Sequence, residues 1–354
     1  MISMSASPSL LLFGLLLALP TGSSPPSPSL SHSHSRSLFM VKVIGVCYGV
    51  HGDNLPPPAS VVQLYKSKNI TAMRIYSPDT TTMQALKGSG LLVTVGVANE
   101  DIQRMATDST AASTWVHTYI TPFLPLYLLY VAVGHNVIPG ELAGFVLPAM
   151  KNLQTALSAA GVKAKVSTAV SHDGLLGASF PPSAGHFLPE AEPFMTPIVQ
   201  FLAANGSPLL VNLFPYYVHA RNPAIISLDY ALFTAPGPVV VDQGKIYDNL
   251  FDAMVDTMYW ALEKAGAAGV RVVVSETGWP TAGGPAATVS NAQTYNTNLI
   301  EHAAQGTRKT PGGTEVYIFS MFNENQKAAA VEQNFGLFNP DETSVYPIDL
   351  RTLP

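Results

Sequence analysis

The sequence predicts an α/β protein, a single (β/α)8 TIM barrel with an open cleft at the C-terminal face of its strands. Eight short apolar segments rich in β-branched residues recur along the chain, with segments of helical spacing between them. No linker divides the body of the chain. A doubly wound sheet is the alternative, but no G-x-G-x-x-G motif follows a strand and no P-loop is present.

The eight predicted strands define the order of the barrel. They are residues 43–48, 72–76, 91–97, 127–133, 164–169, 209–214, 270–275 and 316–322. Each consists largely of Val, Ile, Leu, Ala or aromatic residues, as expected for strands that are buried on both faces. We predict that a helix follows each strand, because eight strand–helix units match a barrel of this length.

Three of the intervening segments have clear helical patterns. Apolar side chains recur at helical spacing from Leu250 to Leu262, where Gly266 stops the helix, and from Val146 to Leu157. A third helix begins with Ser290 in a capping-box pattern and runs toward residue 300.

Composition excludes several classes of function. The chain has 354 residues, a net charge of −5 and only 18 Lys and Arg, so we expect no nucleic-acid partner. The single cysteine, Cys47, rules out an internal disulfide framework and a multi-cysteine zinc site. We expect Cys47 to be a small buried apolar side chain. No metal-ligand motif and no cofactor motif is present, so we expect neither group.

Residues 1–40 differ from the body and are predicted to be a signal peptide and leader. Leu10 to Leu19 is an apolar run that is too short to span a bilayer and fits the core of a signal peptide. The body, residues 41–354, has no run long enough for a transmembrane helix and ends without a hydrophobic tail, so we expect secretion without a membrane anchor. Asn69 begins a glycosylation sequon.

Reactive side chains in a barrel gather at the C-terminal ends of its strands. Glu276 is the strongest candidate, because it follows an apolar strand. An acidic side chain in such surroundings needs either a partner for its charge or a functional role. Glu324 has the same position on the eighth strand and could pair with Lys327. Trp279 is predicted to form an apolar wall for a sugar, and we assign Tyr216, at the end of the sixth strand, to substrate binding as well.

Several stretches resemble the plant endo-1,3-β-glucanases of glycoside hydrolase family 17. They cover essentially the whole body, and the stretch around Glu276 is the most specific. The matching stretches are residues 44–49, 53–56, 73–76, 180–185, 227–233, 250–256, 272–280, 321–327 and 335–340.

The resemblance implies a secreted protein of the cell exterior or cell wall, or of the vacuole, that hydrolyses 1,3-β-glucan with retention and without a cofactor. By match to the motif, Glu276 is the nucleophile. Tyr48, Tyr76, Glu324 and Lys327 match residues that position the sugar or orient the carboxylates. We expect a monomer.

The sequence departs from the family at the end of the fourth strand. The family has Gly-Asn-Glu there, and its glutamate is the acid/base, whereas this chain has His135 and Asn136 after the glycine. An amide cannot release a proton to a leaving group, and losing general acid help costs ~10²–10⁴-fold. His135 should point to the opposite face of the strand from Asn136, so we expect no rescue from it. Glu324 is the better stand-in, and Glu141 is a weaker one.

A second departure is Phe214, where the family commonly has a tyrosine. Two hypotheses remain open. The chain is an active or weakly active 1,3-β-glucan hydrolase, or it is an inactive relative that binds glucan or acts as a decoy.

Overall fold

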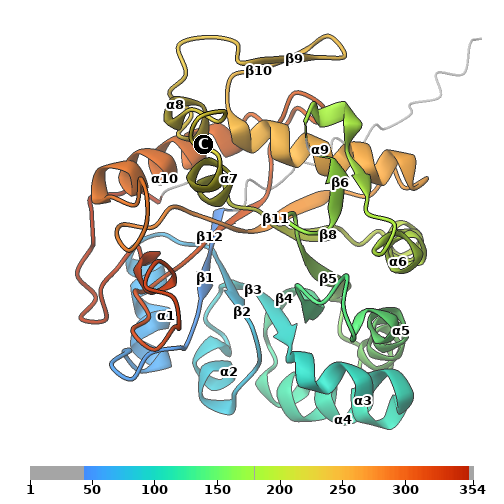
Figure 1. The fold of residues 1–354 in the computed structure, drawn as a ribbon. Coiled ribbons are helices and arrows are strands. Elements are labelled where there is room, and N and C mark those ends of the chain that lie inside the picture. Colours follow the sequence, from blue (N-terminus) through green and yellow to red (C-terminus); the bar gives the residue numbers. More distant parts are fainter. Residues whose placement is uncertain (1–43, 179, 351–354) are drawn as a thin grey trace, which may run out of the picture. The chain divides into compact units, whose positions relative to one another are not determined.

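The computed structural model describes residues 44–178 and 180–350, and the predicted signal peptide and leader lie outside them. Eight parallel strands close into a barrel in the order β1-β12-β11-β8-β5-β4-β3-β2 (Figure 1). The ring closes because β1 pairs in parallel with both β2 and β12. This confirms the predicted TIM barrel. The strands are β1 (Ile44–Tyr48), β2 (Ala72–Ile75), β3 (Leu92–Val97), β4 (Tyr127–His135), β5 (Lys165–Ser171), β8 (Leu209–Asn212), β11 (Val272–Thr277) and β12 (Val316–Ile318).

Burial explains why these segments form strands. Every residue of β1, β2, β8, β11 and β12 is buried, because the inner face fills the barrel and the outer face packs against helices. Cys47 is fully buried in β1, as predicted, and its thiol donates a hydrogen bond to the Ser275 carbonyl at 3.3 Å.

Helices lie around the outside of the barrel (Figure 1). They are α1 (Pro58–Ser67), α2 (Thr80–Leu86), α3 (Ile102–Thr107), α4 (Ser109–Tyr119), α5 (Ala143–Ala159), α6 (Glu192–Asn205), α7 (Pro215–Arg221), α8 (Leu228–Ala231), α9 (Leu250–Lys264) and α10 (Val289–Ala303). The three helices read from periodicity are α5, α9 and α10. None of the helices in the described part of the chain is both long and apolar enough to cross a membrane.

The start of α10 differs from the prediction. The N-cap is Thr288, whose hydroxyl accepts a hydrogen bond from the Asn291 backbone N–H at 3.1 Å. Ser290 is already inside the helix. The backbone of Thr288 is extended, with φ −139° and ψ 154°, which is the conformation that a capping residue requires.

The expectation that a helix follows every strand is wrong at the eighth strand. After β12 the described chain forms only a short 3₁₀ turn, η4 (Glu332–Asn334). Two antiparallel hairpins, which periodicity did not reveal, are inserted in the loops between barrel strands. The first pairs β6 (Leu176–Ala178) with β7 (His186–Phe187), and the second pairs β9 (Val240–Asp242) with β10 (Lys245–Tyr247). The other 3₁₀ turns are η1 (Asn99–Asp101), η2 (Thr121–Phe123) and η3 (Pro182–Ala184).

Two barrel strands lose regular register near their C-terminal ends. The pairing of β4 with β5 shifts between Ala132 and His135, and the pairing of β11 with β8 shifts between Val274 and Glu276. Gly134 and Asn136 also have positive φ angles of 89° and 55°. Such irregularities redirect side chains, because alternation between faces holds only where the ladder is regular.

Candidate active site

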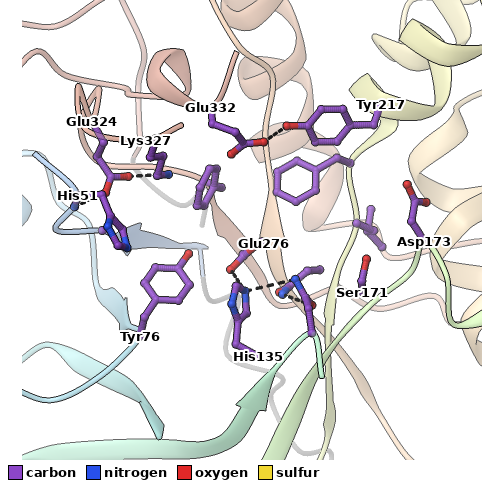
Figure 2. A pocket seen from close by; sticks show the side chains of 16 residues that line it. His51, Tyr76, His135, Ser171, Asp173, Tyr217, Glu276, Glu324, Lys327 and Glu332 are labelled. Atoms are coloured by element: carbon purple, nitrogen blue, oxygen red, sulfur yellow. Dashed lines mark hydrogen bonds and ion pairs between the residues drawn. The ribbon is translucent and has the colours of Figure 1, made fainter. Parts of the chain in front are cut away.

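A cavity of about 420 Å³ lies at the C-terminal ends of the strands (Figure 2). Side chains from five strand ends line it, since Tyr76 follows β2, His135 ends β4, Ser171 ends β5, Asn212 ends β8 and Glu276 lies in β11. The position agrees with the rule that barrel enzymes build their sites on this face.

Two further cavities share wall residues with this one. A cavity of about 450 Å³ shares His51 and Tyr76 and includes Tyr48, and a cavity of about 460 Å³ shares Asp173. The three hollows are thus neighbours that have wall residues in common. Tyr48 therefore lies on the wall of a neighbouring hollow and not on that of the cavity around Glu276.

Glu276 is a buried carboxylate held by two nitrogen donors. It is 4% exposed, and its Oε1 lies 3.0 Å from Nη1 of Arg74 and 3.0 Å from Nε2 of His135. Burial by itself raises the pKa of Glu276. The charges of His135 and Arg74, together with hydrogen bonds, outweigh burial and lower the pKa from 4.5 to about 2. Glu276 is therefore an anion at neutral pH.

Arg74 connects Glu276 to the strand ends around it. The guanidinium is buried, and its Nη1 also donates to Oδ1 of Asn212 at 2.9 Å and to the Ser275 carbonyl at 2.6 Å. The ring of Tyr76 covers it, with a distance of 5.0 Å from the guanidinium carbon to the ring centroid. Because an arginine cannot lose its proton in a protein, this donor is permanent.

His135 corrects the expected orientation. Its side chain lies on the cavity wall beside Glu276 and not on the opposite face from Asn136 (Figure 2). The expectation assumed regular alternation, and the register shift in β4 removes it. The backbone of His135 is fixed by Asn99, whose side chain accepts from the His135 N–H at 2.9 Å and donates to its carbonyl at 3.1 Å.

Asn136 lies on the same wall and is oriented by a chain of hydrogen bonds. Oδ1 of Asn212 accepts from Arg74 and, at 2.8 Å, from the hydroxyl of Ser275. The Nδ2 group of Asn212 then donates to Oδ1 of Asn136 at 3.0 Å. The amide nitrogen of Asn136 is consequently the end of the chain that faces His135, at 3.5 Å from its Nε2.

Glu324 and Lys327 lie together at one end of the cavity (Figure 2). Glu324 is 1% exposed, and its carboxylate accepts from the His51 backbone N–H at 2.8 Å and lies 2.8 Å from Nζ of Lys327. Lys327 also lies 4.2 Å above the ring of Phe319. Glu324 is thus held as the partner of a cation, which makes it a poor stand-in for a proton donor.

Two further carboxylates line the cavity. Glu332, on η4, accepts a hydrogen bond from the Tyr217 hydroxyl, and Asp173 pairs with Arg221. Asp173 follows the fifth strand, so its place at this face of the barrel can be predicted from its position in the sequence. Glu332 follows no strand, and no motif in the sequence pointed to it.

The structure contradicts two of the expected substrate-binding positions. Trp279 is fully buried, donates its Nε1–H to the Ala286 carbonyl at 3.0 Å and packs against Tyr216 at a centroid distance of 5.2 Å. Tyr216 is itself only 2% exposed, and neither residue lines the cavity. The reason is that α7 begins at Pro215, so helical geometry directs Tyr216 inward and leaves Tyr217 on the cavity wall.

Phe214 and Glu141 are the remaining positions that the sequence singled out. Phe214 lines the cavity and packs edge-on against Phe319 and Phe335. Glu141 is exposed and does not line the cavity, so the structure gives it no place as a substitute acid. Within residues 44–178 and 180–350, no group of three or more His, Cys, Asp and Glu could hold a metal ion.

Comparisons of the whole chain with known proteins point to one family. The model of the glycosyl hydrolases family 17 matches residues 44–350. An acidic isoform of glucan endo-1,3-beta-glucosidase from Zea mays is 50% identical over 343 residues, which cover 96% of this chain and 95% of that protein. Lichenase-2 from Hordeum vulgare is 47% identical over 310 residues, covering 87% of this chain and 99% of that one. A solved structure described as one of two plant beta-glucan endohydrolases with distinct substrate specificities has a TM-score of 0.85 at 48% identity, covering 86% of this chain and 100% of that one.

Proposed function

Because this chain belongs to glycosyl hydrolase family 17, we propose that it acts on 1,3-β-glucan and that Glu276 is the nucleophile of a retaining reaction. The carboxylate of Glu276 supports this assignment, since it is ionised and rigidly held at the C-terminal face of the barrel. In such a reaction the carboxylate attacks the anomeric carbon and forms a covalent glycosyl-enzyme. Tyr76 and Lys327 on the cavity wall, and Tyr48 in the adjoining hollow, would position the sugar.

We further propose that cleavage of the polymer is impaired. A retaining glycosidase needs a second carboxyl group ~5–5.5 Å from the first, to protonate the departing oxygen and then activate water. The family pattern puts this group at position 136, where the chain has an amide. The observation that carries the proposal is that the other carboxylates of the described cavity wall, Asp173, Glu324 and Glu332, each already have a partner.

The second candidate function is a glucan-binding or decoy protein without hydrolytic activity. The same observation favours it, because a cleft that keeps its aromatic and charged lining can bind a polysaccharide even where it cannot protonate the leaving group. The two candidates differ in what Glu276 does. A weak enzyme forms a covalent intermediate, whereas a decoy does not.

The experiment separates the two chemical steps. With 2,4-dinitrophenyl β-laminaribioside, whose leaving group needs no proton, we expect a covalent adduct on Glu276, detected by intact mass and located by peptide mapping. The adduct should persist, since the base that activates water is missing. Rapid turnover of laminarin by the native chain would overturn the impairment. The absence of an adduct would favour the decoy.

Replacing Asn136 by glutamate provides the reverse test. Asn136→Glu should raise the rate of laminarin hydrolysis by ~10²–10⁴-fold, measured as reducing ends. The double variant Asn136→Glu/Glu276→Gln is the matched control, because it has the acid but not the nucleophile and should stay inactive. No gain in the single variant would mean that another defect dominates.

We also propose that the protein is secreted, to the cell exterior, the cell wall or the vacuole, and that it acts as a monomer. The leader predicted over residues 1–40 supports secretion.

A further inference from the structure

We propose that this site transfers glucosyl units from activated β-glucosides to acceptors that are already anions, of which carboxylates are the expected class. The proposal rests on the proposed function, because it starts from a glycosyl-enzyme on Glu276. It goes beyond that function by assigning a productive fate to the intermediate in place of slow hydrolysis.

The first step needs no proton. An oxygen of Glu276 forms a bond to the anomeric carbon, the bond from that carbon to the aglycone oxygen breaks, and the electron pair leaves with a stabilised phenolate or carboxylate. A general acid contributes little when the leaving group is already a stable anion. A donor with such a leaving group therefore avoids the defect at position 136.

The second step needs no base if the acceptor carries its own negative charge. A lone pair of the acceptor oxygen forms a bond to the anomeric carbon, the ester bond to Glu276 breaks, and its electron pair returns to the carboxylate. No proton moves in either direction. Water and alcohols, in contrast, must lose a proton to a base that position 136 does not supply.

Electrostatics favours an anionic acceptor at this stage. In the free enzyme the charge of Glu276 is balanced by Arg74, which is 2% exposed and 3.0 Å away. Formation of the ester removes the negative charge and leaves the buried guanidinium without its counter-charge, which is costly. Arg74 does not line the cavity, so an approaching carboxylate does not contact it, but the unbalanced positive charge raises the potential in the cavity and favours an anionic acceptor over a neutral one.

The hydrogen-bond chain through Asn212 presents a donor to the acceptor. Because Arg74 can only donate, Asn212 must accept from it and donate to Oδ1 of Asn136, which leaves the Nδ2 protons of Asn136 facing the cavity. His135 does not accept a hydrogen bond from these amide protons. Its Nε2 lies 3.0 Å from a carboxylate oxygen of Glu276 and must therefore donate there. The exposed amide of Asn136, whose Nδ2 lies 3.5 Å from Nε2 of His135, thus offers an N–H donor where the family has a carboxylate that would repel an anion.

The test uses 2,4-dinitrophenyl β-laminaribioside as donor, with azide, formate and acetate as anionic acceptors and methanol as the neutral one. We expect azide and formate to accelerate release of dinitrophenolate by on the order of 10²-fold, as expected when a missing base is bypassed. Proton NMR should show a β-configured glycosyl azide, because two displacements retain the configuration. Methanol should have little effect.

Two variants at position 136 separate the amide's role from the mere lack of a base. Asn136→Glu should hydrolyse the donor rapidly and lose its response to anions. Asn136→Ala still lacks a base but loses the N–H donor, so the azide concentration that gives half-maximal acceleration should rise about three- to tenfold. An unchanged azide response in Asn136→Ala would refute the assigned role of the amide.

The outcomes distinguish this proposal from the proposed function. If the adduct forms on Glu276 but no anion accelerates its turnover, or if methanol works as well as azide, anion transfer is wrong and the nucleophile assignment stands. If no adduct forms, both are wrong.

Discussion

At the scale of single residues, the site depends on the pairing of Glu276 with Arg74. A buried carboxylate without a partner would take up a proton, since burial penalises the charged form. Two donors on one oxygen reverse that preference and keep Glu276 ionised, as a nucleophile must be. The same pairing makes the carboxylate of Glu276 less basic, so the attack proposed for it would depend more on help at the leaving group.

This pairing predicts a pH dependence of stability. The pKa of Glu276 falls from 4.5 when unfolded to about 2 when folded, so its contribution is fully present above pH 4.5 and is lost as the pH falls toward 2. By linkage, the native chain should lose about 2 kcal/mol more free energy of unfolding between pH 6 and pH 3 than Glu276→Gln does, measured by urea denaturation. Parallel pH profiles for the two proteins would contradict the lowered pKa.

At the scale of elements, the end of β4 determines what the site contains. A regular strand would turn His135 away from the cavity, but the shifted register places its ring beside Glu276, 5.3 Å from the ring of Tyr76. The irregular end of β11 likewise carries Glu276. Both irregularities lie at the C-terminal ends of the strands, next to the site, and the pairing of β3 with β4 also shifts lower in the barrel, between Val93 and Thr94.

Two substitutions near the start of α10 test where this helix begins. Thr288→Ala removes the hydroxyl that accepts from the Asn291 N–H and should lower the free energy of unfolding by about 1 kcal/mol. Ser290→Ala, also exposed but already inside α10, should change it by less than about 0.5 kcal/mol. Urea denaturation of both variants measures the difference. A larger loss from Ser290→Ala would mean that the helix begins there.

At the scale of the whole molecule, the two ends of the barrel have separate tasks. The C-terminal end holds the cavity, whereas the N-terminal end is tied by a polar network around Glu315, which directly precedes β12. The Glu315 carboxylate accepts from the Tyr130 hydroxyl at 2.9 Å and from Nη1 of Arg271 at 2.9 Å. Because Glu315 is 8% exposed, removing it leaves the Tyr130 hydroxyl and Nη1 of Arg271 without this acceptor, although Nη2 of Arg271 still donates to the Tyr130 hydroxyl at 2.9 Å.

This division predicts that stability and activity can be separated. Glu315→Ala should lower the free energy of unfolding by about 2–3 kcal/mol, which is below the ~3–5 kcal/mol expected for a fully buried pair because Arg271 is partly exposed. The rate at which Glu276 is glycosylated by the dinitrophenyl donor should not change. Glu301→Ala, which removes an exposed carboxylate, is the control and should be neutral within about 0.5 kcal/mol. A loss of glycosylation rate in folded Glu315→Ala would show that the two ends are coupled.

The pattern of apolar residues is enough to predict the barrel and the position of Glu276, and the family resemblance adds the role of nucleophile. Eight apolar segments are enough to predict the strands, because burial on both faces leaves a continuous apolar pattern, and strand order then places Glu276 at the C-terminal face. The substitution at Asn136 is likewise readable, because it changes the type of side chain at a matched position.

Which side chains meet in the site depends on tertiary packing. Periodicity assumes regular elements, so it could not place His135 beside Glu276, bury Trp279 and Tyr216, or bring Glu332 to the cavity. These outcomes depend on register shifts, on the start of α7 and on loops, where direction is set by contacts between segments that are distant in the sequence. The chemistry at Glu276 is therefore a property of residue types, whereas its partners are a property of the packed barrel.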